Sequence, residues 1–103
     1  MKSITRYRGD DWGLAVEISG VDIEDATFQA QARPSFDSDV VYEFTCTKDE
    51  SATPSSRVDC SLPAHITETI EYQTLIFDIE MTLDGSIQTL MQLRIEVLKD
   101  VTR

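Results

Sequence analysis

Few side chains in this sequence have the type and spacing that catalysis requires. His65 is the only histidine, and a catalytic histidine needs a neighbouring nucleophile and a third group that orients its ring. No such pattern surrounds His65, so we expect it on the exposed side of a helical turn. Asp78 and Glu80 imitate the carboxylate pair of glycoside hydrolases. They also suit the solvent-exposed face of a strand, where Arg94 and Glu96 on the partner strand could pair with them. This structural interpretation is favoured.

Metal binding is also poorly supported. Asp22, Glu24 and Asp25 form the densest acidic segment, but a calcium site needs six to eight oxygen ligands, usually on a loop shaped by glycine. The spacing here matches no such loop. Cys46 and Cys60 are too few for a zinc site or a disulfide scaffold. The sequence therefore predicts no catalytic residues, no metal and no cofactor.

The two cysteines have a second possible role, which is to pair with each other. Cys46 and Cys60 both fall on the predicted inward parity of strands that are expected to be neighbours. A cross-strand disulfide is therefore geometrically possible. Buried free thiols are favoured in a reducing cytosol, and the sequence leaves the choice open.

Charge and hydropathy exclude two classes of partner. The chain has 103 residues and a formal net charge of −10, and so acidic a surface repels the phosphates of nucleic acids. No apolar run is long enough to span a bilayer. Residues 1–3 lead directly into a strand pattern without the apolar core of a signal peptide. We therefore expect no nucleic acid partner, no membrane and synthesis in the cytoplasm.

The strongest secondary-structure signal lies in residues 72–101. It predicts two long strands joined by a turn at Asp84 and Gly85, with one apolar face, because successive side chains of a strand point to opposite sides. The predicted inner residues are Leu75, Phe77, Ile79, Met81, Leu83, Ile87, Met91, Leu93, Ile95 and Val97. The inner residues of both strands carry odd numbers, so a two-residue loop would turn one apolar set outward. We therefore predict a three-residue loop, 83–85.

The rest of the chain predicts five shorter strands and one helical turn. The strands are expected at residues 5–8, 14–19, 27–33, 40–47 and 57–62, and the helical turn at 63–70. With the hairpin this makes about seven strands, each followed by turn signals. Such a pattern is typical of a two-sheet antiparallel, immunoglobulin-like β-sandwich. We expect one domain, residues 1–103.

Some apolar residues do not fit a simple inside-outside alternation and are candidates for an interface. Trp12 and Tyr7 could either close one end of the core or anchor a partner subunit. Ile76, Leu90 and Leu98 interrupt the polar face of the final hairpin. An apolar residue on a polar face suggests that another chain covers part of it.

The chain also resembles the small immunoglobulin-like virion proteins of tailed bacteriophages, including the N-terminal domain of baseplate upper proteins. The resemblance follows the order of several segments, namely residues 7–10 (YRGD), 14–18 (LAVEI), 26–33 (ATFQAQAR), 61–64 (SLPA), 72–81 (YQTLIFDIEM), the turn at 84–85, and 100–103 (DVTR). It implies a non-enzymatic tail, neck or baseplate connector, adaptor or decoration subunit. Such a protein is made in the host cytoplasm and docks with other virion proteins and with copies of itself, as a symmetric homo-oligomer or in many copies per particle. Baseplate proteins of this kind continue into helical linkers, whereas this sequence ends after the predicted sandwich.

Two other function classes are carried as alternatives. The first is a carbohydrate- or peptide-binding β-sandwich, in which Trp12 would be the expected exposed aromatic residue. The second is a small enzyme, which would need a pocket containing His65 or paired carboxylates with shifted pKa values. The enzyme is the least favoured, because no convergent polar cluster can be named.

Overall fold

The computed structural model describes residues 1–19, 22–49 and 56–99. In this part of the chain it has seven strands and one short helix: β1 (Ser3–Tyr7), β2 (Trp12–Ile18), β3 (Thr27–Arg33), β4 (Tyr42–Asp49), β5 (Ser56–Leu62), α1 (Ala64–Thr67), β6 (Thr74–Leu83) and β7 (Ser86–Leu98). The all-β class, the number of strands and the single helical turn agree with the sequence-based expectation. The predicted end of the last strand at residues 100–101 lies outside the described residues, as does the closing 100–103 segment.

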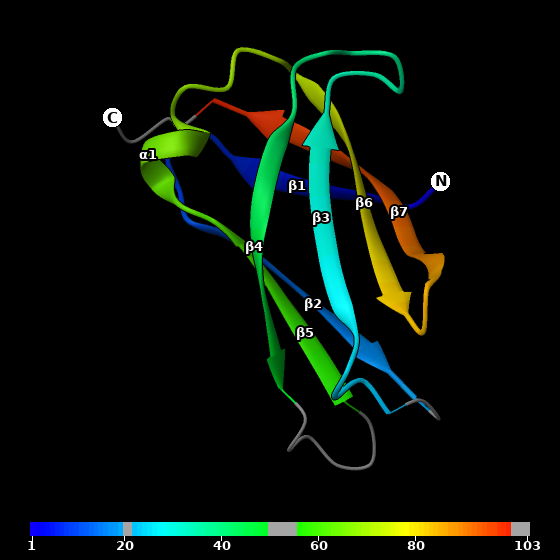
Figure 1. Cartoon of the computed structure of the whole chain (residues 1–103). Helices are drawn as coiled ribbons and strands as arrows, with labels where there is room; N and C mark the ends of the chain where they lie inside the picture. The colour runs from blue at the N-terminus through cyan, green and yellow to red at the C-terminus, as the bar shows by residue number, and fades with distance from the viewer. Residues whose placement is uncertain (20–21, 50–55, 100–103) are drawn as a thin grey trace.

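The predicted two-sheet sandwich is wrong. All seven strands form one sheet in the order β1-β7-β6-β3-β4-β5-β2, and this sheet rolls into a nearly closed barrel (Figure 1). The sheet is also mixed rather than antiparallel. β1 runs parallel to β7, from the pair Ser3 and Arg94 to the pair Tyr7 and Leu98.

One strand explains why two layers do not separate. β4 pairs through residues 42–44 with β3 and through residues 45–49 with β5. It therefore belongs to both halves of the barrel and joins them into a single sheet. Alternating apolar residues show only that one face of a strand is covered. A second sheet can cover that face, but a sheet that rolls into a barrel covers its own inner face equally well.

The gap in the nearly closed barrel lies between β1 and β2, which are the two edges of the sheet. Side chains bridge these edges. Arg6 Nη2 donates to the carbonyl oxygen of Gly13 over 3.2 Å, and Trp12 Nε1 donates to the carbonyl oxygen of Tyr7 over 2.8 Å. These bonds help to satisfy backbone groups that would otherwise be free at a sheet edge.

The turn of the final hairpin differs from the prediction. Leu83 pairs with Ser86, which leaves a two-residue loop of Asp84 and Gly85. Both residues have positive φ, 53° and 80°, as a type I′ turn requires. The predicted three-residue loop is therefore wrong, and the Asp-Gly pair forms the turn that it usually forms.

A β-bulge reconciles this short loop with the apolar pattern. Ile79 pairs with Met91, whereas the next residue, Glu80, pairs with Thr89, so Leu90 is an extra residue in β7. A bulge shifts the inside-outside alternation by one position. Beyond it, Ile87 lies on the outer face and is 69% exposed, contrary to its predicted inward position.

The barrel interior holds the core. Of the hairpin residues expected to face inward, seven are buried, namely Leu75, Phe77, Ile79, Met81, Leu93, Ile95 and Val97, whereas Leu83 and Met91 are only half-buried and Ile87 is exposed. Phe77, Ile79 and Ile95 have no exposed surface. Phe77 meets Phe44 edge to face, with ring centroids 5.1 Å apart and an angle of 73° between the rings. The inward face that the sequence predicts for the hairpin, from residue 75 to residue 81 and from 93 to 97, is confirmed.

Candidate functional site

The acidic segment before β3 is organised by a lysine. Lys48 Nζ donates to the carbonyl oxygens of Ile23, Glu24 and Ala26 over 3.2, 2.7 and 3.1 Å. Asp22 Oδ1 accepts a hydrogen bond from the backbone N–H of Glu24. Within residues 1–19, 22–49 and 56–99, no three His, Cys, Asp or Glu side chains come close enough to hold a metal ion.

The candidate catalytic groups are not brought together. His65 is exposed on α1. Asp78 is half-buried on the outer face of β6, with Gln31 and Gln92 as its neighbours on β3 and β7. Arg94, which the sequence suggested as an ionic partner on this face, lies opposite Ile76 instead.

Thr67 fastens the turn between β1 and β2 to α1. Its side chain is fully buried. Its hydroxyl donates to the carbonyl oxygen of Asp10 over 2.7 Å and accepts from the backbone N–H of Gly9 over 3.1 Å. Beside it, Asp11 Oδ1 accepts from the backbone N–H of Ala64 over 2.7 Å, at the start of α1. These bonds hold the segment that leads out of β1 in place.

We expect Thr67→Val to lower the free energy of unfolding by about 2 kcal/mol, because it keeps the side-chain shape but removes the hydroxyl from two buried or partly buried hydrogen bonds. Urea denaturation followed by circular dichroism measures this change. Thr67→Ser is the control, since it keeps the hydroxyl. A valine variant as stable as the serine variant would show that these hydrogen bonds contribute nothing.

Exposed apolar residues gather at one end of the barrel. Because of the strand pairings, β1, β3 and β7 end there, and β4 and β6 begin there; the β3–β4 loop and the connection from α1 to β6 both lie at the top of Figure 1. The large hydrophobic side chains exposed in this region are Tyr7, Phe36, Val40, Val41, Tyr72 and Leu98. We call this set the apolar end. The other exposed large hydrophobic residue of the hairpin, Ile87, lies beside the turn at the opposite end.

Two parts of the apolar end also interact through their charges. The pKa of Tyr42, the first residue of β4, is raised by burial and then by the charges of Tyr72 and Glu71. Charges act in this way only over short distances. The beginning of β4, next to Val41, therefore lies near the connection between α1 and β6.

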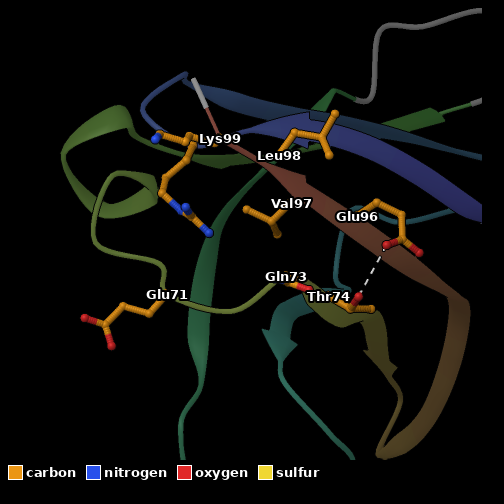
Figure 2. Close-up of a pocket in the computed structure, with 8 residues that line it drawn as sticks. Glu71, Gln73, Thr74, Glu96, Val97, Leu98 and Lys99 are labelled. Carbon is orange, nitrogen blue, oxygen red and sulfur yellow. Dashed lines mark hydrogen bonds between the residues drawn. The ribbon is translucent and has the colours of Figure 1, made fainter. Parts of the chain in front are cut away.

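A hollow of about 520 Å³ opens at the apolar end, between the end of β7 and the segment before β6 (Figure 2). It is lined by Arg8, Glu71, Gln73, Thr74, Glu96, Val97, Leu98 and Lys99. Thr74 Oγ1 donates to Glu96 Oε2 over 3.3 Å, and the backbone N–H of Val97 donates to the carbonyl oxygen of Gln73 over 2.9 Å.

Arg8 forms hydrogen bonds with both sides of the hollow, the end of β7 and the segment before β6. Its backbone N–H donates to the carbonyl oxygen of Leu98 over 2.9 Å, and its Nη2 donates to the carbonyl oxygen of Tyr72 over 3.4 Å. Its Nε is buried and has no hydrogen-bond partner among the described residues. The hollow thus contains two cationic residues, Arg8 and Lys99, and two carboxylates, Glu71 and Glu96.

The five predicted interface residues occupy three different parts of the barrel. Tyr7 and Leu98 are paired across β1 and β7 and are 45% and 42% exposed, so they lie together at the apolar end. Ile76 is half-buried on the outer face of β6. Trp12 is buried in the core, and Leu90, at the bulge, is half-buried and packs against the core.

Four members of the apolar end were not predicted from the sequence. Val40 was expected to begin a strand with an inward side chain, but β4 begins only at Tyr42, and Val40 and Val41 are both exposed. Phe36 and Tyr72 lie in connections between strands. The adjacency of Val40 and Val41 was the available signal, because two consecutive strand residues cannot both face inward.

The chain matches no known protein-family model and no curated protein. Among the described residues there is also no helix with the length and hydropathy needed to cross a membrane. The description of the apolar end therefore depends on the geometry of this chain.

Proposed function

We propose that this protein is a non-enzymatic structural subunit of a bacteriophage particle that docks with neighbouring virion proteins and copies of itself through the apolar end. The observation that carries the docking proposal is the gathering of six exposed large hydrophobic side chains at one end of the barrel. Exposed apolar residues that cluster in this way mark interaction surfaces. Tyrosines such as Tyr7 and Tyr72 are among the residues that contribute most at interfaces.

The charge distribution supports self-association at this end. Because each copy has a net charge of −10, two copies repel each other in most relative orientations. The charges around the hollow are balanced, because its lining contains two cationic residues, Arg8 and Lys99, and two carboxylates, Glu71 and Glu96. A symmetric contact centred on the hollow, and not on the β3–β4 loop that carries Asp37 and Asp39, would therefore bury apolar area without bringing together two strongly acidic surfaces.

The assignment to a phage particle has a separate support, which is the resemblance of several sequence segments, in their order, to those of small virion proteins. The immunoglobulin-like sandwich that this resemblance implied is not the fold of the chain. A tail, neck or baseplate subunit made in the host cytoplasm is thus proposed from the segments, and docking is proposed from the geometry. Their tests are separate as well.

The residue expected to bind the ligand in the alternative, a carbohydrate- or peptide-binding module, is not available at the surface. Such sites commonly present an exposed aromatic side chain, and Trp12 was the candidate. Trp12 is 1% exposed and its indole N–H is already bonded to the backbone. It belongs to the core, so no specific observation favours this alternative.

We expect Leu98→Glu to raise the dissociation constant of the homo-oligomer by about 30-fold or more, because an anchor residue at an interface contributes about 2 kcal/mol or more. Sedimentation velocity across a range of concentrations measures this change. The matched control is Ile87→Glu, which places the same charge on an exposed apolar residue at the other end of the barrel and should leave association unchanged.

The two parts of the proposal, self-docking and the virion assignment, are contradicted by different results. A wild-type chain that sediments as a monomer at every concentration, or an Ile87→Glu variant as impaired as Leu98→Glu, would remove self-docking at the apolar end. The virion assignment is tested by mass spectrometry of gradient-purified particles of the phage that encodes the chain. Absence of the chain from those particles would contradict that assignment alone.

A further inference from the structure

Two cysteines face each other in the ladder between β4 and β5. Cys46 and Cys60 are direct partners in the antiparallel register, their Sγ atoms are 3.9 Å apart, and both are free thiols. Direct partners in an antiparallel pair have Cα atoms roughly 4.5–5.5 Å apart. This spacing falls within the range that a disulfide spans, so side-chain rotation alone can bring the sulfur atoms together.

The two thiols differ in their access to solvent. Cys46 is half-buried, whereas Cys60 is buried. Burial is the largest of the causes that raise the pKa of the Cys60 thiol to about 12, followed by the charge of Cys46, a hydrogen bond with Cys46 and the charge of Asp59. Cys60 is therefore a poor nucleophile by itself. Cys46 is the sulfur that an oxidant in solution reaches first.

We propose that Cys46 and Cys60 are an oxidation site, at which a small-molecule disulfide such as glutathione disulfide converts the two thiols into one intramolecular cross-strand disulfide. The thiolate of Cys46 attacks one sulfur of the oxidant, which forms a mixed disulfide and expels one glutathione thiolate. That thiolate takes the proton of Cys60. The Cys60 sulfur then attacks the Cys46 sulfur and expels the second glutathione as a thiolate, which takes up the proton that Cys46 released on ionising. The protein loses two electrons and two protons, and one glutathione disulfide becomes two glutathione thiols.

The position of the pair gives the bond a structural consequence. β2 pairs with β5, and β5 joins the rest of the sheet through β4. A bond between Cys46 and Cys60 therefore fixes covalently the ladder that connects β5 and β2 to the other five strands. It also closes a loop of residues 47–59, which restricts the unfolded chain. Oxidation should therefore make it harder for β5 and β2 to separate from the rest of the sheet.

The test is to incubate the purified full chain with glutathione disulfide and to measure its intact mass and its melting temperature. We expect the mass to fall by two hydrogen atoms and the melting temperature to rise by roughly 10 °C, and dithiothreitol should reverse both changes. Cys46→Ser is the control and should show neither change. Cys46→Ala serves the same purpose if the serine variant folds poorly.

Different results would overturn the two parts of this inference. Thiols that stay reduced, a stable glutathione adduct on Cys46, or chains linked to one another would overturn the intramolecular disulfide. A disulfide that forms but leaves the melting temperature unchanged, or lowers it, would overturn the proposed strengthening of the β4–β5 ladder. The outcome is independent of the docking proposal, because the two cysteines lie in the stretch where β4 pairs with β5, whereas β4 reaches the apolar end through its first residues.

Discussion

Trp12→Ala is expected to lower the free energy of unfolding by about 3 to 5 kcal/mol, the usual cost of removing a large aromatic side chain from a core. Trp12 is 1% exposed, and its indole N–H donates to the carbonyl oxygen of Tyr7. Alanine would leave a cavity at the start of β2 and would also remove a bond across the seam between β1 and β2. Urea denaturation followed by circular dichroism measures the loss.

Trp12→Phe is the matched control for this experiment. Phenylalanine keeps most of the buried apolar area but cannot donate to Tyr7, so we expect a smaller loss of about 1 to 2 kcal/mol. Trp12 is the only tryptophan, and its fluorescence in the wild-type chain should shift to longer wavelength on unfolding. An alanine variant within about 0.5 kcal/mol of the wild type would place Trp12 at the surface, and would restore it as a candidate binding residue.

Phe77→Ala is expected to cost a similar amount, about 3 to 5 kcal/mol. Phe77 has no exposed surface and lies on β6, an interior strand of the sheet. Its ring packs edge to face on Phe44, which adds to the loss beyond the buried area. The midpoint of urea denaturation should fall, while the slope of the transition should stay the same because the unfolded chain exposes nearly the same surface.

Phe36→Ala is the control, because it makes the same chemical change at a side chain that is 57% exposed. Its effect on the free energy of unfolding should stay within about 0.5 kcal/mol. If Phe36→Ala were as damaging as Phe77→Ala, the assignment of Phe77 to the core and of Phe36 to the surface would be wrong. Phe36 belongs to the apolar end, so its substitution is expected to affect association instead.

Together, the stability and association experiments separate two kinds of apolar residue. Trp12 and Tyr7 were equivalent candidates in the sequence, because both are large aromatic residues near the start of the chain. In the structure, Trp12 is buried and Tyr7 is 45% exposed beside Leu98. Substitution of Trp12 should reduce stability, whereas substitution of Tyr7 or Leu98 should reduce association.

The sequence-based interpretation succeeded where the deciding interactions are local. The alternation of residues 75–81 predicted the buried face of β6, because side-chain direction along a strand depends only on position. β3 was predicted with its bounds, Thr27–Arg33, since Pro34 follows it and proline disfavours continuation of the ladder. Asp84 and Gly85 form the two-residue loop that these residue types favour. The predicted three-residue loop was wrong because it gave more weight to the inside-outside alternation of the two strands than to the turn residues.

The same alternation could not reveal the bulge at Leu90. An extra residue in one strand changes the pairing of two strands, and this change can be seen only when both strands are placed side by side. It moved Ile87 to the outside. The candidate site was only partly predictable for a related reason: Tyr7 and Leu98 lie at opposite ends of the sequence and meet because β1 pairs with β7.

By itself, the sequence determined the all-β class, most strand positions and the inner face of the long hairpin, because these depend on residue types and a period of two. Only the tertiary structure decided that the sheet covers itself instead of pairing with a second sheet, that β1 lies parallel to β7, and that six apolar side chains share one end. These features depend on which strands become neighbours. Strand neighbours are chosen by contacts between distant residues, which leave no periodic pattern in the sequence.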